Sequence, residues 1–330
     1  MPLRLIEFTL PAGAAKALDD LPHSSDTLHC WDIPLSDGKV LTRLLVDTRR
    51  AEGMLDDLLA HFSHVDAFRI VLLPVEATWP RPTPPEAEDA VEAKSPERIS
   101  REELYHDVVQ SAELSRVFAA QVVLATLVAA VGLMRNDTAV LIGAMVIAPL
   151  LGPNMALCLA TTLGDMELVR KSLKTNFAGL SVAFISAASI GLLFPINPSL
   201  EAIASRTHVS TGDVILALAS GCAGVLAFTS GAPSALIGVM VAVALLPPFA
   251  VFGLLLASGE FAAASGALML VATNVICVNL SGVLTFFAQG LRPRTWWESE
   301  RAISATRLAV VTWSTLLVVL LGLIYLATRS

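Results

Sequence analysis

The chain has 330 residues, of which 55% are hydrophobic and 15% are charged, and its mean hydropathy is +0.68. This composition excludes an ordinary soluble globular protein and predicts an integral membrane protein, with the lipid bilayer as its first partner. The net charge of −7 and the lack of a long basic run argue against nucleic acid as a partner.

The first 75 residues alternate patterns typical of strands and of helices. We expect strands at Leu3–Leu10, Thr27–Leu35, Val40–Asp47 and Ala67–Val75, and helices at Ala14–Leu21 and Glu52–Phe62. The order βαββαβ predicts a ferredoxin-like α+β domain over 1–75. Such small domains either bind regulatory ligands or mediate assembly. Nothing in this one selects a ligand, so an assembly or stabilising role is expected. The N-terminus has no signal peptide core, which favours a cytoplasmic domain.

Two connecting segments follow this domain. Residues 76–99 contain five prolines among acidic residues and alanines, a composition that predicts an unfolded linker. Ser100 and Glu103 then form a capping box, which predicts an amphipathic helix over 100–116 at the membrane surface.

Seven apolar stretches after the linker are long enough to cross a bilayer as helices. They are Val117–Met134, Ala139–Leu163, Phe177–Pro195, Val214–Thr229, Ser234–Ala257, Ser265–Ala288 and Leu308–Ala327. With the N-terminus inside, the cytoplasmic connections carry eleven lysines and arginines and the outer ones carry three. This distribution follows the positive-inside rule and supports seven crossings.

An internal repeat links the second and fifth stretches. The window Ala139–Pro153 aligns without a gap on Ser234–Pro248 at an offset of 95 residues, with eight identities in fifteen positions. Three stretches separate equivalent points, so the second copy is expected to be inverted in the membrane. The chain is accordingly read as a repeat over 117–195, an inverted repeat over 211–288 and a further span over 306–328.

Helix-breaking residues lie at matching places in the two repeats, and we expect a kink or a split in both helices. They are Pro149, Gly152 and Pro153 in the second stretch, and Pro247 and Pro248 in the fifth. If Pro153 and Pro248 each begin a second half-helix, two positive helix ends face a midplane site. Three asparagines could add polar contacts to a solute there: Asn154, Asn274 and Asn279.

Catalysis and cofactor binding are not expected. No Asp, Glu, Lys, Arg or His lies centrally in an apolar stretch, and no metalloprotease motif or intramembrane acid pair is present. The cysteines, at 30, 158, 222 and 277, have no spacing suited to a metal, so we read them as free thiols.

Several segments between residues 104 and 294 resemble the bacterial and archaeal family called domain of unknown function 389. They include GLMRNDTAVLIGAMVIAPLLGP, VALLPPFAVFG and TNVICVNLSG. The resemblance implies a hydrophobic protein of the bacterial or archaeal cell membrane and supplies no activity.

Three functions remain open at this point. The first, which the repeat favours most, is a transporter-like protein that moves a small neutral or anionic solute between its inverted repeats. The second is a channel formed by a homo-oligomer, and the third is a membrane anchor for a sensor or scaffold domain. Duplicated helix breaks favour the first two, because an anchor has no need of them.

Overall fold

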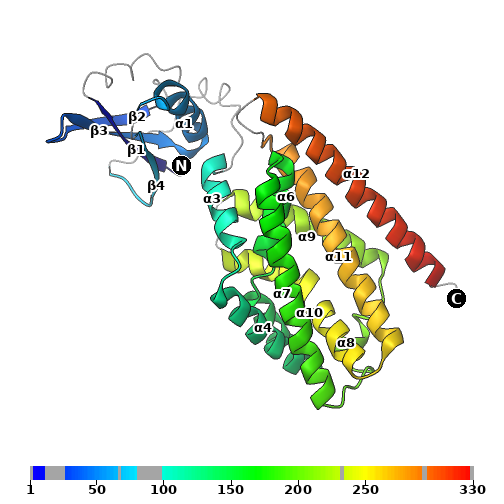
Figure 1. The fold of residues 1–330 in the computed structure, drawn as a ribbon. Helices are drawn as coiled ribbons and strands as arrows, with labels where there is room; N and C mark the ends of the chain where they lie inside the picture. Colours follow the sequence, from blue (N-terminus) through cyan, green and yellow to red (C-terminus); the bar gives the residue numbers. More distant parts are fainter. Residues whose placement is uncertain are drawn as a thin grey trace. The chain divides into compact units, whose positions relative to one another are not determined.

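The computed structural model describes residues 3–11, 27–65, 68–79, 99–230, 234–291 and 296–327 (Figure 1). The chain divides into two compact units, Met1–Leu104 and Tyr105–Ser330.

The first unit contains a four-stranded sheet and a helix. Its elements are β1 (Leu3–Pro11), β2 (Thr27–Pro34), β3 (Lys39–Asp47), α1 (Thr48–Phe62) and β4 (Ile70–Val75). The strand order is β2-β3-β1-β4, and every neighbouring pair is antiparallel. The four predicted strands and the second predicted helix are confirmed, whereas the predicted helix Ala14–Leu21 lies outside the described residues.

One face of the sheet is covered by α1. Ile6, Phe8 and Leu10 alternate along β1 and are buried against Leu55 and Leu58 of the helix, as the two-residue period of a strand requires. The helix begins four residues earlier than predicted, because the Asp47 carboxylate caps it by accepting a hydrogen bond from the Arg49 amide at 2.9 Å.

The helix α3 (Arg101–Ser111) begins at the predicted capping residue, since the Ser100 hydroxyl accepts from the Glu103 amide at 3.2 Å. Glu103 forms two hydrogen bonds of 2.9 Å with the Arg4 guanidinium. The Arg101 guanidinium forms an ion pair with the Asp56 carboxylate, with a nitrogen–oxygen distance of 3.1 Å. These ion pairs join the first turn of α3 to the sheet unit, so that unit reaches beyond the boundary predicted at residue 75.

The second unit is helical. Its long helices are α4 (Arg116–Met134), α5 (Thr138–Ile147), α6 (Leu151–Leu163), α7 (Met166–Leu193), α9 (Thr211–Thr229), α10 (Ser234–Ala257), α11 (Phe261–Ala288) and α12 (Trp296–Ala327), and α8 (Glu201–Ala204) is a single turn. Within the described residues, five helices are long and apolar enough to cross a membrane, or six if α5 and α6 form one bent span. The seventh crossing, by α10, stays a prediction.

Helix ends recur 95 residues apart in this unit. The first and last residues of α4 lie 95 positions before the first and last residues of α9, and the same holds for α7 and α11. The serine hydroxyls of Ser115 and Ser210 cap α4 and α9 in the same way. Gly164 and Gly259 have φ angles of 73° and 86°, which favour glycine in each turn before α7 and α11.

The long helices also cross in a reciprocal way. The helix α7 packs on α10, and its counterpart α11 packs on α6 (Figure 1). A Cβ added to Gly253 would lie 2.7 Å from the Cβ of Ala187, and one added to Gly282 would lie 2.7 Å from the sulfur of Cys158. At the offset of 95 residues, Cys158 corresponds to Gly253 and Ala187 corresponds to Gly282. The same two repeat positions therefore form both crossings. Glycine occupies one of these positions in the first crossing and the other position in the second.

Candidate functional site

The predicted break in the second apolar stretch is present. The helix α5 ends at Ile147, α6 begins at Leu151, and the two are bent by 50°. Ala148, which precedes Pro149, is extended with a ψ of 117°, because a proline disfavours the helical conformation of the residue before it. The chemistry of Pro149 therefore accounts for the place of the break.

The prediction that Pro153 begins the second half-helix is wrong. It is the third residue of α6, which starts at Leu151. A proline is tolerated there, because the amides of the first helical turn have no partner within the helix.

The corresponding prediction for the fifth stretch is wrong in one respect. The helix α10 is not split, and Pro247 and Pro248 lie inside it. Both are buried, and α10 packs on α7, α11 and α5. Neighbouring helices of this kind allow a membrane helix to continue through proline, although the carbonyls of Val243 and Ala244 lose their usual amide partners.

Asn154 and Asn279 meet between α6 and α11. The Asn279 amide nitrogen donates to the Asn154 side-chain oxygen at 3.3 Å and to the Val275 carbonyl at 2.8 Å. The Asn154 amide nitrogen donates to the Leu150 carbonyl at 2.9 Å. The Cys158 thiol completes the cluster by donating to the Asn279 side-chain oxygen at 3.4 Å.

Both asparagines are almost inaccessible, with exposed fractions of 6% for Asn154 and 0% for Asn279. Their amides therefore contribute a polar cluster inside an apolar interface, close to the helix break. We call Asn154, Cys158 and Asn279 the asparagine cluster.

The other predicted site residues are distributed around this cluster. Ala148 and Leu150 from the break share a buried apolar cluster with Leu246 and Phe249 beside the prolines of α10, so the two predicted segments belong to one core.

Asn274 of α11 is also buried. It precedes Asn279 by five residues, and five residues correspond to a rotation of about 140° around a helix axis. It therefore lies on a different face of α11.

The C-terminal end of α3 abuts the break. A Cβ added to Gly152 would lie 2.7 Å from the Cβ of Ser111. The Thr175 hydroxyl of α7 donates to the Ala112 carbonyl at 2.8 Å. Nearer the start of α3, the Tyr105 hydroxyl donates a hydrogen bond to the Asp165 carboxylate at 2.6 Å. Partial burial, together with this acceptor, raises the pKa of Tyr105 to about 12.

Two polar residues of α7 were missed in the sequence. Ser172 and Asn176 lie one turn apart, and the Ser172 hydroxyl and the Asn176 amide nitrogen are buried without a partner. Such atoms are normally satisfied by water, an ion or a bound solute. The sequence did contain a signal for this pair, since two polar residues four apart, which share a helix face, follow the basic residues Arg170 and Lys171.

Within the described residues, no group of three His, Cys, Asp or Glu side chains could hold a metal ion. The site is thus built from amides, hydroxyls, a thiol and the backbone of a broken helix.

The profile of a family described as a domain of unknown function (domain of unknown function 389) matches residues 145–280. A protein of Methanocaldococcus jannaschii, itself described as uncharacterized, is 36% identical over 325 residues, which cover 98% of this chain and 99% of that protein. The chain belongs to this family. No solved structure matches it.

The region shared with domain of unknown function 389 begins in α5 and ends one residue after Asn279. It therefore contains the break, the prolines of α10 and the whole asparagine cluster. The archaeal relative is similar along both units, including the residues of the sheet unit.

Proposed function

We propose that this member of domain of unknown function 389 is a transporter-like membrane protein that moves a small neutral or anionic solute between two inverted repeats. The supporting observation is the recurrence, at an offset of 95 residues, of helix ends, caps and helix crossings. With α10 as a full span, each repeat crosses three times, and an odd number inverts the second copy.

The proposed solute site lies at the α5–α6 break and the asparagine cluster. The first amides of α6 have no partner within the helix and carry its positive dipole end. No acidic residue occurs between 145 and 163 to offset this charge. A neutral or anionic solute therefore suits the site better than a cation.

Movement of the repeats is supported by the small residues at the two long crossings. Gly253 faces Ala187, and Gly282 faces Cys158. Small side chains let helices approach closely and leave few protruding groups to oppose a sliding motion. We propose that α7 moves against α10 while α11 moves against α6.

For the first unit we propose the ferredoxin-like fold. The order β2-β3-β1-β4 with antiparallel neighbours is the order that a βαββαβ chain adopts in that fold. We propose that this unit is cytoplasmic and serves regulation or assembly of a homo-oligomer, on the basis of the positive charges predicted for that side.

The proposal is tested by solute flux into proteoliposomes that hold the full chain. Glycerol, urea, and the potassium salts of chloride, phosphate and acetate are suitable probes, with osmotic swelling followed by light scattering and with valinomycin added for the salts so that potassium can follow the anion. We expect one or more probes to enter faster than in empty vesicles, with a rate that saturates as their concentration rises.

The kinetics separate the alternatives. Unsaturated flux together with single-channel currents in planar bilayers would favour the oligomeric channel. No flux of neutral or anionic solutes across an extended panel, from a folded and inserted protein, would favour the membrane-anchored sensor or scaffold.

A further inference from the structure

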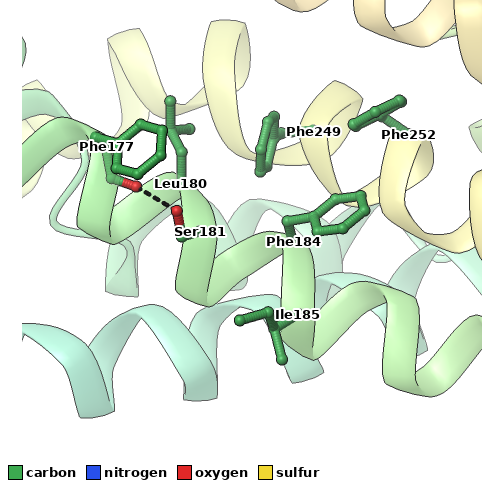
Figure 2. A pocket seen from close by; sticks show the side chains of 7 residues that line it. All are labelled: Phe177, Leu180, Ser181, Phe184, Ile185, Phe249 and Phe252. Atoms are coloured by element: carbon green, nitrogen blue, oxygen red, sulfur yellow. Dashed lines mark hydrogen bonds between the residues drawn. The ribbon is translucent and has the colours of Figure 1, made fainter.

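A groove of about 480 Å³ lies between α7 and α10. Figure 2 shows its seven lining residues, which are Phe177, Leu180, Ser181, Phe184, Ile185, Phe249 and Phe252. The ring centroids of Phe184 and Phe252 are 5.5 Å apart, and those of Phe249 and Phe252 are 6.0 Å apart. The volume falls within the range of roughly 300–1,000 Å³ typical of small-molecule sites.

The groove offers no free polar group. Its one hydroxyl, on Ser181, donates to the Phe177 carbonyl at 2.8 Å (Figure 2). Phe177 and Ile185 are 75% and 64% exposed, so the groove opens to the surface of the helical unit. A hydrocarbon chain fits this lining, whereas a polar solute would lose hydrogen bonds on entering it.

Two basic residues lie on the same stripe of α7, before the groove. Arg170, Lys174, Phe177, Ser181 and Ile185 follow one another at spacings of three or four residues, which places them on one helix face. Both basic side chains belong to exposed residues. Neither forms an ion pair within the described residues, whereas the neighbouring Lys171 is paired with Glu113 at 3.1 Å.

We infer that this groove holds an acyl chain of an anionic phospholipid whose phosphate contacts Arg170 and Lys174. Basic side chains beside an apolar surface match the negative headgroup and the apolar chain of such a lipid. The lipid would lie on the α7–α10 crossing, since Phe184 and Phe249 come from the two helices that meet there.

The crossing of α6 and α11 is lined differently. At the offset of 95 residues, Phe249 corresponds to Asn154, and Phe184 corresponds to Asn279. The asparagines fill that interface with mutual hydrogen bonds. The lipid is therefore expected at one crossing and not at its counterpart.

The test counts phospholipids retained by the full chain. The protein is reconstituted into vesicles of equal parts phosphatidylcholine and phosphatidylglycerol, extracted in a mild detergent, and analysed by native mass spectrometry. We expect the wild type to retain phosphatidylglycerol in preference to phosphatidylcholine. Ser181→Trp, which fills the groove, should lose the retained lipid, whereas Leu216→Trp on the exposed surface of α9 should keep it.

A double variant, Arg170→Gln with Lys174→Gln, separates the headgroup from the chain. It should retain lipid in the ratio of the vesicles, without the preference for phosphatidylglycerol. Because both positions are exposed, this variant remains informative if Ser181→Trp does not fold.

Three outcomes would overturn the inference. They are a wild type that retains both lipids in the vesicle ratio, equal retention by the two tryptophan variants, and disulfide cross-linking of Ile185→Cys between copies, which would show a second chain over the groove.

Discussion

Replacing Gly282 by alanine is expected to destabilise the helical unit, and replacing Cys158 by alanine as well is expected to restore most of the loss. The added Cβ would lie 2.7 Å from the Cys158 sulfur, whereas the Cys158 Cβ is 3.3 Å away. Overpacking of this kind costs about 1–3 kcal/mol. Thermal unfolding midpoints of the purified full chain in detergent would measure both effects.

The reciprocal crossing supplies a second arm to this experiment. Gly253→Ala should also destabilise, because its Cβ would lie 2.7 Å from that of Ala187, and Ala187→Gly should relieve the contact. Gly143→Ala is the control, since nothing lies within 4 Å of the added Cβ. Unchanged midpoints for Gly282→Ala and Gly253→Ala would contradict the close crossings.

The second large effect is expected at the asparagine cluster. Asn279→Leu removes the amide that donates to Asn154 and leaves a buried oxygen with one partner fewer. An unpaired buried polar group costs about 1–3 kcal/mol. Replacing both asparagines by leucine should recover part of the stability, because both polar partners are then absent.

The double leucine variant should recover stability without recovering solute flux. If the amides contact the solute, the double variant stays inactive in the vesicle assay although its unfolding midpoint partly recovers. Thr273→Val is a matched control, because Thr273 is a buried polar residue on the same helix whose hydroxyl, among the described residues, bonds only to the Met269 carbonyl of that helix. Full flux through the double leucine variant would reduce the asparagines to a helix-packing role.

The parts of the structure that depend on local chemistry were predictable. Alternation of apolar residues placed β1, the capping residue Ser100 placed the start of α3, and Pro149 placed the break. In each case the determining interaction lies within a few residues of the chain.

The features that depend on which helices are neighbours were not predictable. The continuity of α10 through Pro247 and Pro248 depends on the helices packed around it. Likewise, the sequence identified Asn154 and Asn279 as separate candidates, and only the packing of α6 on α11 brings them together. The polar pair Ser172 and Asn176 was missed because α7 continues as one helix through the charged turn before its apolar part.

Inverted repeats place two equivalent positions, Met166 and Phe261, on opposite sides of the membrane, and labelling tests this directly. They are the first residues of α7 and α11, and they are 59% and 68% exposed. Each is replaced by cysteine in a chain whose four native cysteines are changed to alanine, and intact cells are treated with a membrane-impermeant maleimide. If the repeats are inverted and the N-terminus is inside, Phe261→Cys reacts and Met166→Cys reacts only after the membrane is opened. Reaction of both positions in intact cells, or of neither, would contradict inverted repeats.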